Sequence, residues 1–273
     1  MCVINEKSQK LEKENKRPLI LVTNDDGYYA GGFKALIEIA KSFGDVVAVA
    51  PEVGNSGMSH AITIKVPIRL RLLDKTEGLA LYACSGTPAD CIKLAINQVL
   101  DRKPDLVLSG VNHGSNSSIS LIYSGTMAGA IEGCLNGIDS VGLSLLDFAR
   151  DANFQASVVY GKRIVSEVLR NGLPKGTCLN VNIPEGNVDE IKGVKVCRQN
   201  KGRWVEEFEK RSDPRGSNYF WLTGYYCNDE PESTDTDEAA LNNKYVSIVP
   251  VKVDLSDYVM INTLNGWNLN ESN

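Results

Sequence analysis

The sequence predicts an α/β protein with a Rossmann-like, mostly parallel sheet, helices on both faces of that sheet, and a β-rich C-terminal arm. Short apolar runs alternate with amphipathic segments through about the first 184 residues, which is typical of βαβ units with right-handed crossovers. The alternation fades after Pro184, where short strand-like pieces take over. The chain has 273 residues, 42% of them hydrophobic, which is long enough to bury one large core.

The first core strand is the apolar run from Pro18 to Thr23, whose composition suits a strand buried on both faces. Apolar residues at helical spacing then predict a helix around 33–40, and the run 46–50 predicts a second strand. Thr87, Pro88 and Asp90 form an N-cap signature for a further helix. Similar patterns predict strands over 61–73, 79–83, 106–108, 141–145 and 179–183, and helices over 87–100, 124–136 and 154–169.

The chain divides into four parts on this reading. Residues 1–17 are polar and lack an apolar segment, so we expect a disordered tail rather than a signal peptide. Residues 18–184 form the α/β core, 185–264 a β-rich arm that returns to the core, and 265–273 a polar tail. Arm strands are predicted over 194–197, 203–208, 219–223 and 245–253, with an acidic loop over 229–238. We expect the arm and tail tryptophans, Trp204, Trp221 and Trp267, to serve packing or an interface.

Charge and cysteine usage limit the classes of partner. The formal net charge is −5 and the pI about 5.3, so a basic surface for a stable nucleic-acid complex is not expected. Small anionic substrates remain compatible, because one cation and a few amide groups can reverse the local sign. Seven scattered cysteines without a C-x-x-C pair predict reduced thiols and a cytoplasmic location. No apolar run is long enough to predict a transmembrane helix.

Adjacent carboxylates follow the first predicted strand. Asp25 and Asp26 stand between Thr23-Asn24 and Gly27, at the carboxyl end of that strand, where open α/β sheets bind ligands. Two neighbouring carboxylates repel each other unless a cation shares them, and hard oxygen ligands favour Mg²⁺, Mn²⁺ or Ca²⁺. The alternative is a plain turn, because Asp-Gly and Asn are turn formers.

Other polar loops are predicted to reach the same edge of the sheet. Ser56 and Asn112 lie in loops rich in Gly, Ser and Asn, and are the candidates to complete a coordination shell. Each alone is more often an ordinary loop residue, and it is the convergence of the loops on one edge that favours a site. Ser124-Gly125-Thr126 begins a predicted helix, either as an anion cradle or simply as its N-cap. Of the two histidines, His113 falls in the right loop to contact a substrate, whereas His60 is expected to be structural.

Ordered motifs occur at 20–27, 49–51, 56–57, 85–90, 104–116, 123–126, 179–184 and 245–250. Together they resemble the SurE survival proteins, a family of 5′/3′-nucleotidases that act on nucleoside monophosphates. The resemblance covers roughly Pro18 to Tyr258. Two departures are the tail before Pro18 and the Ile-Val-Pro at 248–250, where the family more often has Thr before Pro; neither touches the candidate site. The acidic loop 229–238 matches loosely, which leaves the nucleotide preference open.

The resemblance implies roles for particular residues and for a cofactor. It implies one divalent cation per subunit, Mg²⁺ or Mn²⁺, and a homodimer or homotetramer in which the C-terminal arm is exchanged. It also implies 5′-nucleotidase activity, with 3′-nucleotidase and exopolyphosphatase activity as extensions. The metal ligands fall on the residues that the strand-end argument selects, Asp25, Asp26, Ser56 and Asn112, and the phosphate contacts on Asn116, Ser124, Gly125 and Thr126.

The expected reaction is hydrolysis of a nucleoside monophosphate to nucleoside and phosphate, with Asp25, Asp26 and Asn116 as catalytic residues. Two alternatives remain. One is a phosphatase that forms an aspartyl phosphate, although such enzymes usually need Asp-x-Asp spacing and the two carboxylates are adjacent here. The other is a nucleotide-binding module without turnover, which would gain nothing from two extra negative charges. No membrane partner is expected.

Overall fold

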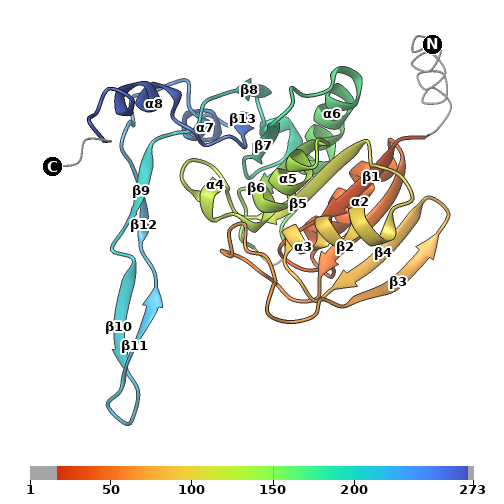
Figure 1. Cartoon of the computed structure of the whole chain (residues 1–273), viewed down its shortest axis with the longest axis horizontal. Helices are drawn as coiled ribbons and strands as arrows, with labels where there is room; N and C mark the ends of the chain where they lie inside the picture. Colours follow the sequence, from red (N-terminus) through yellow and green to blue (C-terminus); the bar gives the residue numbers. More distant parts are fainter. Residues whose placement is uncertain (1–16, 150, 270–273) are drawn as a thin grey trace.

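A computed structural model describes residues 17–149 and 151–269. They form a nine-stranded, mostly parallel sheet in the order β3-β4-β2-β1-β5-β6-β7-β13-β8 (Figure 1). The predicted α/β class is therefore confirmed. β3 and β13 run antiparallel to β4 and β7, and β8 pairs in parallel with β13. The strands are β1 (Leu19–Thr23), β2 (Asp45–Pro51), β3 (Leu70–Thr76), β4 (Leu79–Cys84), β5 (Leu106–His113), β6 (Asp139–Leu145), β7 (Thr177–Ile183), β8 (Val194–Val196) and β13 (Val246–Lys252).

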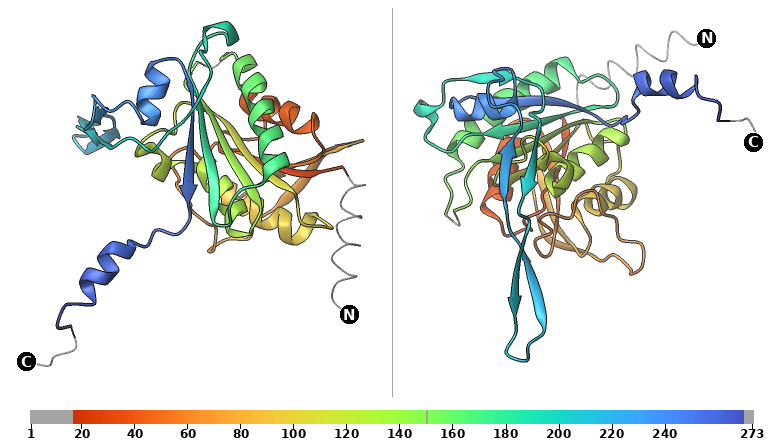
Figure 2. Two further views of the ribbon diagram at one scale, coloured as in Figure 1. Left: turned by 90° about the horizontal axis from the view of Figure 1, so that it is seen from above. Right: turned by 90° about the vertical axis from the view of Figure 1, so that its left-hand side faces the viewer.

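Helices cover both faces of the sheet (Figure 2). In β1, Ile20 and Val22 pack in the core cluster that also holds the apolar residues of α2 and α6. Leu21, between them, points to the opposite face and packs with residues of α3. Because successive side chains of β1 are buried on opposite faces of the sheet, the strand is a continuous apolar run in the sequence. The helices are α2 (Gly31–Lys41), α3 (Pro88–Leu94), α5 (Gly125–Leu135) and α6 (Gln155–Asn171).

Helix α5 approaches the sheet through a stripe of glycines, Gly125, Gly129 and Gly133, spaced one turn apart. A Cβ atom on Gly129 would lie 2.6 Å from Oγ of Ser109 on β5, and one on Gly125 would lie 2.8 Å from Cβ of Asp25. Real Cβ atoms do not approach so closely, so the helix axis could not lie this near the strands with any larger residue. The start of α5 is thereby brought against the end of β1.

The predicted strand over 61–73 is only partly correct, because β3 begins at Leu70. Ala61 and Thr63, which precede β3, form backbone hydrogen bonds with a helix cap and not with a strand of the sheet. The hydroxyl of Thr87 donates to the carbonyl of Ala61 (2.8 Å), and the carboxylate of Asp90 accepts the N–H of Thr63 (3.1 Å). Thr87 and Asp90 also form the predicted capping box at the start of α3.

Other elements differ from the expectation at their ends. The helix predicted over 87–100 is α3 followed by a π-helical turn, η1 (Ala95–Val99). β5 continues to His113, with a register shift against β6 between Ser109 and Asn112, so part of the predicted loop is strand. Three short helices were not predicted, because four to seven residues are too few to show a helical period: α4 (Ser120–Tyr123), α7 (Asp237–Asn242) and α8 (Tyr258–Leu264).

The arm is a long two-stranded ribbon that projects from the body of the molecule (Figure 1). β9 (Gly202–Val205) pairs with β12 (Tyr225–Asn228), and β10 (Phe208–Ser212) pairs with β11 (Asn218–Leu222), both antiparallel. Helix α8 extends separately from the body (Figure 2). No helix within 17–149 and 151–269 is long and apolar enough to cross a membrane. The predicted N-terminal tail lies outside the described residues except for Arg17, as do the last four residues of the predicted C-terminal tail.

Candidate active site

The two carboxylates predicted to carry the chemistry lie in the turn directly after β1. Gly27 makes this turn, with a left-handed backbone (φ 97°) that favours glycine. The side-chain amide of Asn24 donates to the Gly27 carbonyl (2.9 Å) and closes the turn. Asp25 is buried, only 3% exposed, and Asp26 is half-buried. The sequence Asn-Asp-Asp-Gly thus forms a tight turn that also presents carboxylates.

Burial makes both carboxylates costly to ionise. Desolvation raises the pKa of Asp25 from 3.8 to about 6; the Asp26 charge acts in the same direction, while hydrogen bonds from Thr126 lower this pKa. Desolvation also raises the pKa of Asp26, against a hydrogen bond from the backbone N–H of His113. Such a pair favours a nearby cation, which would restore the charged form of both groups.

Three loops meet at these residues, as expected for the carboxyl ends of neighbouring parallel strands. The N–H of Asn55, in the loop after β2, donates to the carbonyl of Asp25 (2.7 Å). The N–H of His113, at the end of β5, donates to the carboxylate of Asp26 (3.3 Å). A cavity of about 580 Å³ opens beside them, and six of the residues singled out from the sequence line it: Asp25, Ser56, Asn112, His113, Asn116 and Ser124.

The start of α5 contacts Asp25 directly. Ser124 is the N-cap, and its hydroxyl accepts the N–H of Met127 (3.0 Å). Thr126 is fully buried, and its hydroxyl donates to the Asp25 carboxylate. Ser124 therefore lines the cavity, whereas Gly125 and Thr126 lie behind Asp25 and are not part of the cavity wall. The positive end of this helix therefore stabilises the charge of Asp25 and does not act directly on a ligand in the cavity.

The oxygen atoms at this end of the cavity fit a hard divalent cation. The side-chain amide of Asn112 donates to the Gly114 carbonyl (2.8 Å), which leaves its oxygen as the atom available to a ligand. Ser56 is exposed on the facing loop and offers a hydroxyl. With Asp25, the cavity lining offers one carboxylate, one amide and one hydroxyl, the donor type that Mg²⁺ and Mn²⁺ prefer. Asp26 is the next residue along the turn but does not line the cavity. The described residues contain no cluster of three or more His, Cys, Asp or Glu side chains suited to a metal.

Asn116 is fixed by residues of β6 and β7 that the sequence reasoning did not select. Its side-chain amide donates to the hydroxyl of Ser144 (2.8 Å), its backbone N–H to the side chain of Asn182 (2.8 Å), and its carbonyl accepts from Asn180 (2.8 Å). Asn180 and Asn182 are fully buried. The signal that could have revealed them is two asparagines alternating with apolar residues inside a core strand, because buried amides need specific partners.

The outer wall of the cavity comes from the arm. This wall is lined by Trp204 of β9, Glu207 and residues 222–224, together with Phe148. Trp204 was expected to serve packing or an interface, and the structure instead places it at this wall. Trp221 and Trp267 are exposed, at 57% and 55%. Residues so far apart in sequence could not be assigned to one cavity before the arm's path was known.

The loop that carries Ser56 is tied to helix α5 through a buried carboxylate. Glu132, 3% exposed, binds Nε2 of His60 (3.0 Å) and Nζ of Lys93 (2.8 Å). These contacts, the His60 hydrogen bond first, lower the pKa of Glu132 from 4.5 to about 2. His60 therefore has the structural role expected of it.

Comparisons with known proteins agree with this architecture. The SurE family model, described as survival protein SurE, matches residues 20–206. A protein named 5′-nucleotidase SurE from Christiangramia forsetii is 52% identical over 258 residues, covering 94% of this chain and 99% of that relative. One of the same name from Bacteroides fragilis is 50% identical, covering 94% and 100%. The crystal structure of the SurE protein from Aquifex aeolicus aligns with a TM-score of 0.79 and 39% identity, covering 91% of this chain and 98% of that one.

The Glu132 tether predicts a pH-dependent contribution to stability. A carboxylate whose folded pKa is depressed stabilises above its unfolded pKa, and that stabilisation is lost as the pH falls towards the folded value. We expect Glu132→Gln to lower the free energy of unfolding by about 2 kcal/mol near pH 7. The difference should shrink as the pH falls from 4.5 towards 2. Urea unfolding between pH 7 and pH 3 measures it.

Glu38→Gln is the matched control, because Glu38 forms an exposed ion pair with Lys162 (3.0 Å) that should contribute little at any pH. A Glu132→Gln effect of the same size at all these pH values would show that the ion pairs of Glu132 do not stabilise the fold.

Proposed function

The chain belongs to the SurE family, and on that basis we propose that it is a 5′-nucleotidase that hydrolyses nucleoside monophosphates to nucleoside and phosphate. The observation that carries this proposal is the composition of one cavity. Its inner end holds the Asp25 carboxylate and oxygen or amide groups suited to a cation and a phosphate, and its outer wall holds Trp204 and Phe148, suited to a nucleoside. The relatives named 5′-nucleotidase SurE support the same activity.

We propose that Asp25, Asp26, Ser56 and Asn112 hold one divalent cation, Mg²⁺ or Mn²⁺. When bound, the cation would neutralise charge on the phosphate oxygens in the transition state.

The chain's own groups would orient the phosphate. The Asn116 amide has a second N–H beyond the one given to Ser144, and it is held rigidly enough to direct that N–H at a phosphate oxygen. Ser124 offers a hydroxyl at the same end of the cavity. Thr126 acts through Asp25, whose orientation it fixes. The aromatic wall would position the nucleoside, so that its phosphate reaches the carboxylate end.

The first test is release of inorganic phosphate by the purified chain. We expect turnover of nucleoside 5′-monophosphates with Mg²⁺ or Mn²⁺, loss of turnover with a chelator, and recovery when the cation is restored. Nucleoside 3′-monophosphates and short polyphosphate belong in the same panel, because we propose both as further substrates. No phosphate release from any 5′-monophosphate with either cation would contradict the proposed function.

The second test concerns the two carboxylates. We expect Asp25→Asn or Asp26→Asn to lower kcat by about 100-fold or more, because each removes a charge that binds the cation. The cation-free variants should remain folded, since burial already disfavours the charged form of both side chains. Phosphate release and thermal unfolding measure the two effects, and Asp74→Asn, at an exposed carboxylate on β3, is the control.

Two outcomes would contradict the ligand assignment. One is turnover close to that of the wild type by either variant in saturating Mg²⁺ or Mn²⁺. The other is a covalent adduct on Asp25 or Asp26 after trapping with a phosphate-mimicking fluoride, which would favour an aspartyl-phosphate mechanism instead.

We further propose that the arm joins subunits into a homodimer or homotetramer. The β10–β11 hairpin exposes Phe208, Phe220, Trp221 and Leu222, at 66%, 58%, 57% and 73%. Phe208, Phe220 and Leu222 share one face of the hairpin and Trp221 lies on the other. Exposed apolar surface of this kind marks an interaction site. The resemblance to SurE proteins implies an arm exchanged between subunits. We therefore propose that a second copy of this chain covers this surface.

The oligomer proposal predicts that charges on the hairpin will separate the subunits. We expect a double variant, Phe220→Asp with Trp221→Asp, to sediment at the monomer mass while the wild type sediments as a dimer or tetramer. Asn218→Asp adds one negative charge at the start of β11 and should leave the wild-type mass unchanged. A monomeric wild type at micromolar concentration would overturn this proposal.

We propose a cytoplasmic location on the basis of the thiols. All six cysteines among the described residues are free, and five are buried, as expected where the compartment is reducing. Recovery of the chain only from an extracellular or periplasmic fraction would contradict this location.

A further inference from the structure

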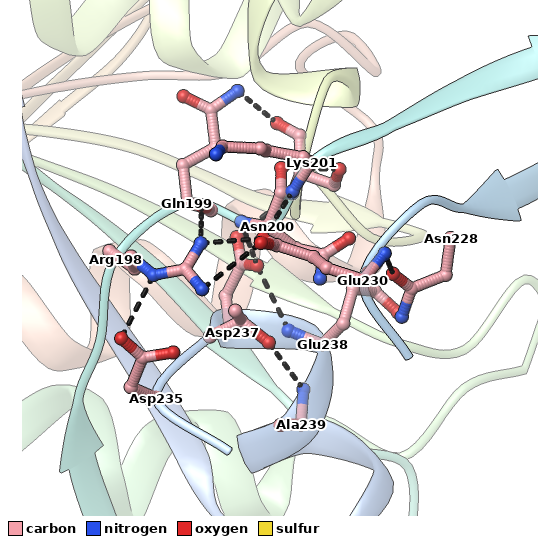
Figure 3. Close-up of polar contacts among 12 residues, drawn as sticks. Arg198, Gln199, Asn200, Lys201, Asn228, Glu230, Asp235, Asp237, Glu238 and Ala239 are labelled. Atoms are coloured by element: carbon pink, nitrogen blue, oxygen red, sulfur yellow. Dashed lines mark hydrogen bonds and ion pairs between the residues drawn. The ribbon is translucent and has the colours of Figure 1, made fainter. Parts of the chain in front are cut away.

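A polar cluster lies at the base of the arm (Figure 3). We call residues 198–201 and 235–239 the arm root. At its centre, the carboxylate of Asp237 is fully buried and accepts three backbone N–H groups, those of Ser118 (2.8 Å), Asn200 (2.9 Å) and Glu238 (2.9 Å). Asp235, two residues earlier, is instead exposed and forms an ion pair with Arg198 (2.9 Å).

Asp237 has no cationic side chain within ion-pair distance among the described residues, and burial raises its pKa. A buried carboxylate without a cation is costly and persists only where its hydrogen bonds are well made. Three backbone donors from three separate segments, at 118, 200 and 238, supply such bonds. Asp237 therefore joins Ser118, which follows the candidate site, to Asn200, which precedes the arm ribbon.

Every polar group of Ser118 is bound by the arm. Its N–H goes to Asp237, its hydroxyl donates to the carbonyl of Asn200 (2.9 Å), and its carbonyl accepts the side-chain amide of Gln199 (2.9 Å). The hydroxyl of Tyr226 on β12 also donates to the Ser118 hydroxyl (2.7 Å). Ser118 has a left-handed backbone (φ 50°), which a serine adopts at a cost and keeps only when its surroundings enforce it.

The two ends of this short loop are held by different parts of the molecule. Asn116 is fixed to the sheet by Ser144, Asn180 and Asn182, and none of those contacts involves the arm. Ser118, two residues later, is fixed to the arm root. Trp204, which faces the cavity, lies four residues beyond Asn200 on the same chain segment. The Ser118 contacts therefore connect the phosphate end of the cavity to its aromatic wall.

We propose that Asp237 is a positioning residue that fixes the Trp204 wall of the cavity relative to the phosphate end, and so sets the enzyme's affinity for the nucleoside part of its substrate. This inference rests on the proposed nucleotidase function. Asp237 does not touch the cavity itself and acts through Ser118 and Asn200. Loss of its three bonds leaves Asn116 on the sheet but lets the arm wall shift.

The test replaces Asp237 with an amide of the same shape. In Asp237→Asn, one carboxylate oxygen is replaced by an NH2 group, which cannot accept a hydrogen bond from a backbone N–H. At least one of the three bonds is therefore lost. We expect the KM for a nucleoside 5′-monophosphate to rise about tenfold, the effect of losing one good hydrogen bond. The Ki for inorganic phosphate, which needs only the phosphate end, should change less than about twofold. Asp235→Asn, at the exposed neighbour, should change neither value.

Tyr226→Phe is the second variant, in case Asp237→Asn does not fold. It removes one hydroxyl that reaches Ser118 and Asn200, and Tyr226 is less buried than Asp237. We expect a smaller rise in the same KM, about threefold, again with an unchanged Ki for inorganic phosphate. Near-UV circular dichroism at the assay temperature confirms that each variant is folded.

A split between nucleotide KM and phosphate Ki in either folded variant supports the inference, because a purely structural defect would alter both in proportion or alter neither. Equal changes in the two constants, or no change in either variant, would overturn it. An inactive wild type would instead overturn the proposed nucleotidase function.

Discussion

The burial of one carboxylate between a strand end and a helix start is the constraint on which the rest of the site depends. Asp25 lies against Gly125 so closely that a side chain there would collide with it, and Thr126 binds its carboxylate. This contact gives the helix terminus an electrostatic role and fixes the carboxylate's orientation. Together with Asp26, the buried Asp25 concentrates negative charge that a cation would neutralise.

Much of the inner end of the cavity could be predicted from sequence because it follows from rules of parallel sheets. An apolar run buried on both faces identifies β1, and the polar residues after such strands collect at one edge. Asp25, Ser56, Asn112, Asn116 and Ser124 do meet at one cavity. The placement of Gly125 and Thr126 behind Asp25 was not predictable, because a helix-start motif does not reveal which of its groups the protein itself will use.

The outer wall could not be predicted for a different reason. Trp204 lines the cavity from the ribbon formed by β9 and β12, and Tyr226 of the same ribbon binds Ser118. That arrangement depends on contacts between residues about 80 to 120 positions apart, to which periodicity and turn signals are insensitive. Buried polar groups such as Asp237, Asn180 and Asn182 read as isolated loop or strand residues until their partners are known.

The glycine stripe of α5 has a consequence for how the protein folds. Three glycines in eleven residues make this segment a poor helix on its own, since each weakens it by about 1 kcal/mol relative to alanine. Its helical form is therefore stabilised mainly by docking on β1 and β5, which must already be paired. We expect the amide protons of α5 to gain protection from solvent exchange only together with those strands. The end of the cavity that holds Asp25 would then be assembled late in refolding, as a cooperative product of the whole core.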